Sequence, residues 1–261
     1  MKIQAIVLDW AGTTVDYGSR APVSVLLEVM RSYDVAITLE EARTYMGLPK
    51  LDHIRATCAL PSVRQRWIER HRAAPDEQAV QRLYADFTPR QLACLEDYSG
   101  LIPGVVKAID RFRARGIRIG SSTGYTRPML EVLLDRAARQ GYRPDASVVP
   151  DEAGEGRPAP YMCYLNAMKL RVYPLSACVK IGDTPSDIAE GRNAGMWTIG
   201  VALTGNEVGL TPDEYTSLSP EEQRTKLQAA RERLLAAGAD FVADSLAECD
   251  PSLDEIERRM A

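Results

Sequence analysis

Short apolar runs, separated by helical patterns, constrain the fold of this chain more than any other feature. Residues 3–10 are almost continuously apolar, which is typical of a strand buried on both faces of a parallel sheet. Similar runs follow much later, at residues 117–122, 146–149, 178–182, 197–203 and 241–244. Strands that alternate with helices indicate βαβ units, so we expect an α/β fold with a doubly wound, Rossmann-like parallel sheet.

Helical periodicity fills the gaps between most of these runs. Residues 105–115 end before Gly116 and residues 127–140 end before Gly141, and glycine commonly ends a helix. Two more helices are expected at residues 161–171 and 187–193. The charged stretch 211–237 is expected to form a solvated pair of helices.

Residues 21–98 break this rhythm, because helical patterns follow one another there without an apolar strand between them. The patterns cover residues 23–33, 39–45, 50–58, 63–72 and 78–96. We therefore predict an α-helical cap domain, residues 21–98, inserted into an α/β core of residues 1–20 and 99–261. Ligands of such sheets bind outside the carboxyl ends of the strands, so an insertion that leaves from the end of the first strand covers that site.

Composition excludes several classes of protein. The 261 residues are 45% hydrophobic and 26% charged, which is an ordinary globular balance. A net charge of −4 gives no general electrostatic reason to bind nucleic acid or an anionic membrane. No apolar run approaches the roughly 20 residues that cross a bilayer, and Asp9 interrupts the N-terminal run too early for a signal peptide. The five cysteines form no CxxC pair, so we expect a cytoplasmic protein without a zinc site or a disulfide framework.

Polar clusters follow the predicted strands and offer groups that bind phosphoryl compounds. In chain order their candidate residues are Asp9, Thr123, Gly124, Arg157, Asp183 and Asp187. Carboxylates suit Mg²⁺, whereas hydroxyl, amide and guanidinium groups suit phosphoryl oxygens. Each cluster also has a plain structural interpretation: Thr184 and Asp187, for example, fit a capping box at a helix N-terminus. Their common order, each beside a predicted strand, favours one shared site.

Taken together, these clusters resemble the four motifs of the haloacid dehalogenase superfamily, and more narrowly those of its phosphonatase (phosphonoacetaldehyde hydrolase) family. The narrower resemblance rests on DWAGTTVDYG, MGLPKLDHIRA, GSSTGYTRPM, GRPAPYM and IGDTPSDIAEGRNAG, which lie between Asp9 and Gly195. It implies an enzyme that hydrolyses the P–C bond of phosphonoacetaldehyde to acetaldehyde and phosphate, in the degradation of 2-aminoethylphosphonate. It also implies a Mg²⁺ cofactor, a small phosphonate substrate and a homodimer.

Two residues separate this family from the phosphatases of the superfamily. Ala11 stands where those phosphatases usually carry a second aspartate, which protonates the leaving alkoxide. Lys50 matches the lysine that, in the family, forms a Schiff base with the substrate aldehyde. A carbon leaving group stabilised as an enamine needs no acid at position 11. A Mg²⁺-dependent phosphatase, a related phosphonate hydrolase, a haloacid dehalogenase and a non-enzymatic phosphate-site scaffold remain the alternatives.

The position of Lys50 also has a physical basis. Pro49 fits the first turn of a helix, so Lys50 lies at the positive end of the helix dipole, where an ammonium is disfavoured. Lowering a lysine pKa by about three units takes about 4 kcal/mol, so desolvation and a nearby cation would have to contribute. His53 follows at i+3 on the same helix face and can shuttle protons. His71 is expected to be structural or exposed.

The resemblance implies the remaining roles. Asp9 is the nucleophile, and the substrate contacts come from Ala11, Met46, Thr123, Gly124 and Arg157. The metal ligands are Asp9, the Ala11 carbonyl oxygen, Asp183 and Asp187, the last directly or through water. Arg157 takes the place where the superfamily often has lysine. Ser19 lies where some family members have cysteine, so we assign it no thiol role.

Overall fold

Six strands form one fully parallel sheet in the computed structural model, which describes residues 1–261. The strand order is β3-β2-β1-β4-β5-β6, with bounds β1 Ala5–Leu8, β2 Arg118–Ser122, β3 Ala146–Val148, β4 Cys178–Gly182, β5 Trp197–Val201 and β6 Phe241–Ala243. This confirms the predicted α/β, doubly wound parallel sheet. β1 is shorter than the apolar run 3–10, because the backbone enters tight turns after Asp9, and the amides of Thr13 and Thr14 donate to the Trp10 carbonyl.

The strand order reverses at β1, which is one of the two central strands of the sheet. Successive strands lie on one side of β1 up to β3 and on its other side from β4 onward. Leu8 is in register with Ser121 of β2 and with Ile181 of β4, so these three strands end side by side. The polar residues that follow them must therefore meet at one edge of the sheet, which is where ligands of such folds bind.

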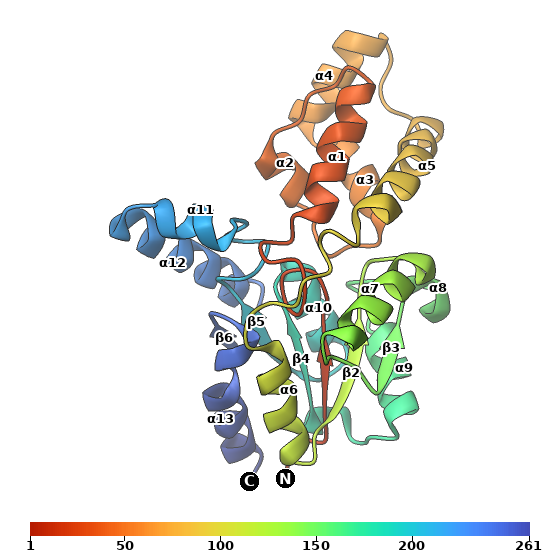
Figure 1. The fold of residues 1–261 in the computed structure, drawn as a ribbon. Helices are drawn as coiled ribbons and strands as arrows, with labels where there is room; N and C mark the ends of the chain where they lie inside the picture. Colours follow the sequence, from red (N-terminus) through yellow and green to blue (C-terminus); the bar gives the residue numbers. More distant parts are fainter.

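Helices cover both faces of the sheet, as Figure 1 shows. The helices outside residues 21–98 are α6 Val105–Ala114, α7 Arg127–Arg139, α8 Pro150–Ala153, α9 Tyr161–Leu170, α10 Pro185–Asn193, α11 Pro212–Ser217, α12 Pro220–Ala236 and α13 Asp250–Met260, with short 3₁₀ turns at Leu175–Ala177 and Leu246–Glu248. Alternate residues of β1 serve the two faces: Ile6 and Leu8 belong to the large apolar cluster with α6 and α7, whereas Ala5 and Val7 pack in a second cluster with α9.

Five helices precede α6 in the segment that connects β1 to β2, with bounds α1 Ala21–Ser32, α2 Leu39–Arg43, α3 Lys50–Ala59, α4 Pro61–His71 and α5 Glu77–Cys94. They gather beyond the carboxyl ends of the strands (Figure 1). The division of the chain into two domains remains a prediction; we call residues 21–98 the cap and the rest the core. Pro89 lies inside α5, within the helical pattern predicted over residues 78–96.

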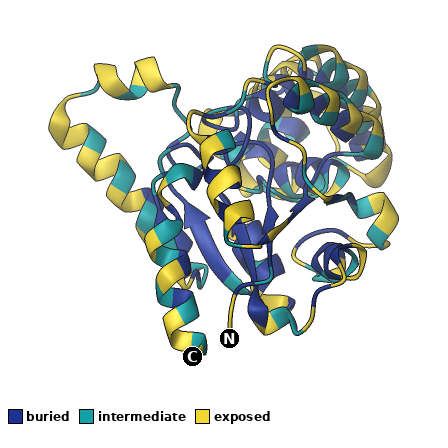
Figure 2. Ribbon diagram, turned by 60° about the horizontal axis from the view of Figure 1, so that its bottom comes forward, coloured by how far each residue is buried: buried dark blue, intermediate teal, exposed yellow.

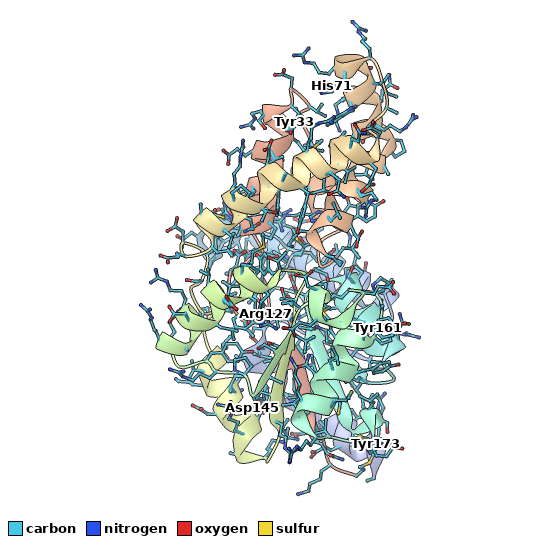
Figure 3. The ribbon with its side chains drawn as sticks, turned by 90° about the vertical axis from the view of Figure 1, so that its right-hand side faces the viewer. Tyr33, His71, Arg127, Asp145, Tyr161 and Tyr173 are labelled. Carbon is cyan, nitrogen blue, oxygen red and sulfur yellow. The ribbon has the colours of Figure 1, made fainter.

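The periphery of the molecule agrees with the sequence in two respects. α11 and α12 extend away from the body, and their surface is mostly exposed (Figure 2). His71 packs on Trp67 at the tip of the cap, with ring centroids 4.5 Å apart, and its Nε2 lies 3.0 Å from the Tyr33 carbonyl oxygen (Figure 3). His71 is therefore structural, as expected. No helix combines the length and apolar character that crossing a bilayer requires.

Candidate active site

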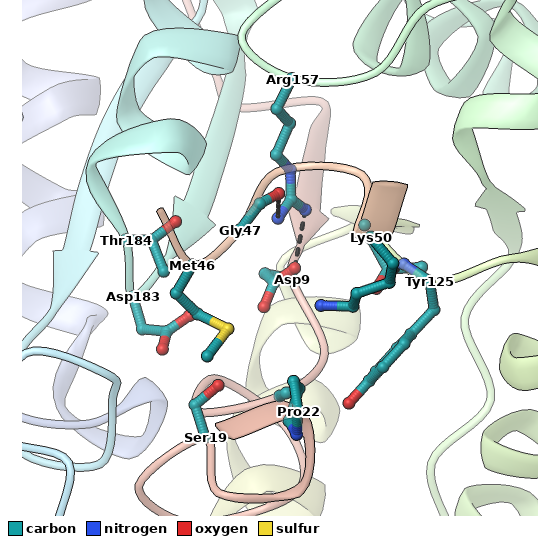
Figure 4. Close-up of a pocket in the computed structure, with 13 residues that line it drawn as sticks. Asp9, Ser19, Pro22, Met46, Gly47, Lys50, Tyr125, Arg157, Asp183 and Thr184 are labelled. Carbon is teal, nitrogen blue, oxygen red and sulfur yellow. Dashed lines mark hydrogen bonds and ion pairs between the residues drawn. The ribbon is translucent and has the colours of Figure 1, made fainter. Parts of the chain in front are cut away.

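A small pocket lies where the cap meets the carboxyl ends of β1, β2 and β4 (Figure 4). Its lining comprises Asp9, Ala11, Ser19, Pro22, Met46, Gly47, Lys50, Thr123, Gly124, Tyr125, Arg157, Asp183 and Thr184. The structure thus brings eight of the ten residues singled out from the sequence to one pocket. The other two, His53 and Asp187, are buried beside it.

Asp9 follows β1 and is only 5% exposed. Its Oδ1 accepts a hydrogen bond of 2.7 Å from Arg157 Nη2. Burial raises the pKa of the Asp9 carboxyl, and the negative charge of Asp187 raises it further, while Arg157 opposes both effects. The carboxylate form, which is the nucleophilic one, therefore depends on positive charge close by.

Arg157 is held by carboxylates on several sides. Its Nη1 lies 3.0 Å from Asp187 Oδ1, and its Nε donates to Glu190 Oε2 at 2.9 Å. Burial disfavours the charged guanidinium, but these carboxylates raise the pKa of Arg157 well above its ordinary value. Its Nη2 also donates to the Ser122 carbonyl at 2.8 Å, so the guanidinium is fixed from the sheet side of the pocket.

Three buried carboxylates meet at the bottom of the pocket, and their donor atoms lie within 4.8 Å of one another. They belong to Asp9, Asp183 and Asp187. Adding Glu190, Arg157 and Lys180, which are also buried, gives four carboxylates and two cations, a formal excess of two negative charges when every carboxyl is ionised. Oxygen donors with that excess charge fit a hard divalent cation. The residues present therefore agree with a metal site.

Asp183 and Asp187 are positioned in different ways. Asp183 Oδ2 accepts from the Asn206 amide at 2.7 Å, and burial together with the charge of Asp9 raises the pKa of Asp183. Asp187 forms the predicted capping box with Thr184 at the start of α10. Burial opposes its ionisation, yet the charges of Arg157 and Lys180 lower the pKa of Asp187. The neighbouring cations thus favour the ionised form of Asp187, whereas burial and the charge of Asp9 disfavour the ionised form of Asp183.

Lys50 begins α3, as the sequence predicts, but Pro49 is the capping residue before the helix rather than part of its first turn. The side chain of Lys50 enters the pocket from the cap, and its Nζ lies 4.7 Å from the centre of the Tyr125 ring (Figure 4). Burial lowers the pKa of Lys50 to about 8, against the pull of Asp9 and with the help of Arg157. The lowered pKa increases the share of Lys50 that is a free, nucleophilic amine near neutral pH.

His53 lies one turn along α3 from Lys50 and is 1% exposed. Its Nε2 is 2.8 Å from the Ala42 carbonyl oxygen, which can only accept, so Nε2 carries the proton and Nδ1 is the basic atom. Burial, with the charge of Lys50, lowers the pKa of His53 to about 3. A role in proton transfer remains a prediction, and the geometry limits it to the neutral ring accepting at Nδ1.

Several residues of the site were not identified from the sequence. Lys180 on β4 reaches Asp187 Oδ1 at 2.9 Å and donates to Ser122 Oγ at 3.1 Å. Tyr125 and Ser19 line the pocket without having been assigned a role. Lys180 had a signal that could have been used, because a lysine inside the apolar strand Cys178–Gly182 must find buried partners. Tyr125 had no signal beyond its neighbours in the motif, and Ser19 drew notice only as the position where some family members have cysteine.

Comparison with known proteins places this geometry in a family. The model of haloacid dehalogenase-like hydrolases matches residues 3–195, and one described as HAD-hydrolase-like matches residues 155–249. Phosphonoacetaldehyde hydrolase of Syntrophobacter fumaroxidans is 50% identical over 97% of this chain and 92% of its own length. Phosphonoacetaldehyde hydrolase of Bacillus cereus is 46% identical over 99% of this chain and 98% of its own length.

A solved structure agrees with these relatives. The crystal structure of a phosphonoacetaldehyde hydrolase-like protein from Oleispira antarctica superposes with a TM-score of 0.97 at 39% identity, covering 100% of this chain and 95% of that one. The match extends over the sheet and the cap helices alike. The chain therefore belongs to the phosphonoacetaldehyde hydrolase family of the haloacid dehalogenase-like hydrolases, and it is a hydrolase.

Proposed function

We propose that this chain hydrolyses the P–C bond of phosphonoacetaldehyde to acetaldehyde and phosphate through covalent intermediates on Lys50 and Asp9. One observation carries the proposal: a buried amine with a lowered pKa and a buried carboxylate line the same small pocket, one from the cap and one from the core. An amine captures an aldehyde, and a carboxylate attacks phosphorus. The relatives named for this reaction supply the substrate class.

The proposed sequence starts at Lys50. Its free amine adds to the aldehyde and releases one water to form an imine, which is protonated at nitrogen. Asp9 then attacks phosphorus, and the electron pair of the breaking P–C bond moves into the protonated imine to give an enamine. Protonation at carbon and hydrolysis by one water release acetaldehyde from Lys50. A second water hydrolyses the aspartyl phosphate, so the net reaction consumes one water.

Ala11 fits this chemistry because the leaving group is carbon. A phosphate ester needs an acid to protonate its departing oxygen, and alanine cannot supply a proton. The imine supplies the electron sink instead, so the acid is dispensable. For the other pocket residues we propose that Thr123, Gly124 and Arg157 bind the phosphonyl oxygens and that Met46 packs beside Lys50.

We propose Mg²⁺ as the metal, held by Asp9, Asp183, the Ala11 carbonyl oxygen and Asp187, the last directly or through water. The support is the three-carboxylate cluster and its excess of negative charge. When bound, the ion supplies positive charge that screens the Asp9 carboxylate from an anionic phosphonate. A homodimer, a cytoplasmic location and a place in 2-aminoethylphosphonate degradation also remain proposals; sedimentation velocity tests the first.

The cap must open for substrate to enter. The cavity has a volume of only about 20 Å³, which is room for about one water molecule. Phosphonoacetaldehyde is several times larger. We therefore propose that the cap opens for exchange and closes for chemistry, which also desolvates Lys50.

The test measures phosphate and acetaldehyde release from phosphonoacetaldehyde with Mg²⁺, with borohydride added to a parallel sample. The proposal expects equal release of both products, and borohydride trapping of a substrate adduct on Lys50. Two variants separate the covalent steps. Asp9→Asn is expected to lose phosphate release but keep the adduct, whereas Lys50→Arg is expected to lose both. A folded wild-type protein that binds Mg²⁺ but gives neither product nor adduct would overturn the assignment.

A Mg²⁺-dependent phosphatase is the main alternative, and the same variants test it. A phosphatase would hydrolyse phosphate esters, and Lys50→Arg would leave that activity intact. Ala11 weighs against it, because the usual acid is missing. Turnover of esters that survives Lys50→Arg, with no turnover of phosphonoacetaldehyde, would establish the phosphatase instead.

A further inference from the structure

Arg43, the last residue of α2 in the cap, reaches across to the core. Its Nη1 donates to the Gly18 carbonyl at 2.9 Å and to Asn206 Oδ1 at 3.0 Å, and its Nη2 donates to the Gly209 carbonyl at 2.9 Å. These bonds join the cap to the core segment between β1 and α1 and to the loop between β5 and α11. No step of the proposed reaction uses Arg43, and it does not line the pocket.

The loop that Arg43 holds is also the loop that holds Asp183. The backbone amide of Asn206 donates to Asp183 Oδ2 at 2.7 Å, while the side chain of the same residue accepts from Arg43. Thr204 Oγ1 donates to the Gly12 carbonyl at 2.8 Å, in the turn that follows the nucleophile. One residue, Asn206, thus contacts the cap arginine with its side chain and the buried carboxylate with its backbone.

Two glycines leave the space that this arrangement needs. A Cβ at Gly209, whose φ is +66°, would lie 2.6 Å from Arg43 Cζ. A Cβ at Gly205 would lie 2.4 Å from Asp183 Cβ. Side chains at these positions would displace the guanidinium or the carboxylate, so the loop is shaped to both groups.

We propose that Arg43 is a positioning residue that couples closure of the cap to the cation site. With the cap closed, the guanidinium fixes Asn206, and the Asn206 amide holds Asp183 in place to bind the divalent cation. When the cap opens, these bonds break and Asp183 loses its support. By reciprocity, cation binding favours the closed cap. The inference rests on the proposed cation site.

Mg²⁺ affinity, measured by calorimetric titration of the metal-free protein, tests the proposal without relying on turnover. Arg43→Met is expected to weaken Mg²⁺ binding about tenfold, as loss of a group behind a metal ligand commonly does. Arg43→Lys keeps the charge but cannot form all the bonds, so an intermediate loss is expected. The matched control is Arg66→Met, which breaks an ion pair with Glu41 inside the cap; its Mg²⁺ affinity is expected to equal that of the wild type.

Hydrogen exchange at the Asn206 amide gives a second readout. Arg43→Met is expected to speed this exchange while the amides of the central strands keep their protection. Asn206→Ala removes the side-chain oxygen that accepts from the guanidinium but keeps the backbone amide of residue 206. Its effect on amide exchange and that of Arg43→Met are therefore expected to be non-additive in the double variant.

Three outcomes are decisive. Wild-type protein that binds Mg²⁺, with Arg43→Met and Arg43→Lys binding it equally well and Asn206 protection unchanged, would overturn the coupling alone. Wild-type protein that binds no divalent cation would overturn the proposed metal site and the coupling with it. A selective loss of affinity in the Arg43 variants, with Arg66→Met unaffected, would support both.

Discussion

Lys50 and Lys180 are both buried, one in the cap and one in the core, yet their surroundings shift their pKa values in opposite directions. Lys180 lies between Asp187 and Glu190, with Nζ–O distances of 2.9 and 3.3 Å. Lys50 forms no salt bridge and faces the ring of Tyr125. Burial disfavours the charge of both, but the carboxylates raise the pKa of Lys180, whereas the pKa of Lys50 falls to about 8.

The difference shows that burial alone does not make a lysine reactive. Partners decide whether the buried amine is a fixed cation or a nucleophile. The core pairs Asp187 and Glu190 with Lys180 and Arg157, which fixes these side chains at the phosphoryl-binding end of the site. The cap contributes an amine that its surroundings leave without a salt bridge. Because Lys50 has no carboxylate in a salt bridge, its ammonium form is not stabilised as that of Lys180 is.

Exchanging Lys50 for arginine is the strongest test of this comparison. Lys50→Arg keeps a positive charge but removes the nucleophilic amine, so we expect phosphonoacetaldehyde turnover to fall by at least about 10³-fold. Acetaldehyde release measures the effect, and circular dichroism checks the fold. Lys226→Arg, on the exposed face of α12, is the matched control and is expected to keep full activity. Substantial residual turnover in Lys50→Arg would mean that no imine forms there.

For Lys180, the expected loss is one of stability. Lys180→Met leaves Asp187 and Glu190 buried with one cation fewer, and breaking a buried pair in this way typically costs about 3–5 kcal/mol. Urea unfolding at pH 7 measures the change. Adding Glu190→Gln removes one of the uncompensated charges, so the double variant is expected to be more stable than Lys180→Met alone. Equal stability of Lys180→Met and wild type would remove the contrast between the two lysines.

Much of the fold could be predicted from the sequence because its signals are local. Near-continuous apolar runs identified the strands, and their alternation with helices predicted the parallel sheet that the structure confirms. The polar residues after β1, β2 and β4 meet because parallel strands end together. Lys50 at the start of α3 followed from Pro49, although the proline precedes the helix.

The rest of the site depends on contacts that no local pattern encodes. Arg43 and Asn206 are far apart in the chain, and their bond exists only because the cap folds back on the core. The low pKa of His53 likewise depends on burial under neighbouring helices, since its spacing from Lys50 shows only that both lie on one face. The bond between Arg157 and Glu190 likewise joins residues that are distant in the sequence, so it could be identified only from the tertiary structure.

Substituting methionine for Lys50 is expected to change stability in the sense opposite to Lys180→Met. The folded-state pKa of about 8 lies below the ordinary 10.5, so the protonated amine destabilises the fold fully below pH 8, and the penalty fades as pH rises toward 10.5. Lys50→Met removes that penalty of up to about 3 kcal/mol. Urea unfolding should therefore show the variant more stable than wild type at pH 7, with the two curves converging above pH 10. A loss of stability at pH 7 would mean that the ammonium is well accommodated.

The smallest expected effect concerns how fast Lys50 reacts as pH changes. With a pKa of about 8, the free amine is about a tenth of the population at pH 7 and about nine tenths at pH 9. Because the free amine is the form that attacks the aldehyde, borohydride trapping under limiting conditions should speed up about tenfold between these values and then level off. Asp9→Asn, which is expected to form the adduct without cleaving it, lets this step be measured alone. The negative charge of Asp9 favours the Lys50 ammonium. Asp9→Asn removes that charge, so the trapping profile of this variant should lie at lower pH than that of the wild type. A trapping rate that keeps rising through pH 10 would mean that Lys50 has the pKa of an ordinary lysine. Lys50 and Lys180 would then differ in their salt-bridge partners, but their pKa values would not be shifted in opposite directions.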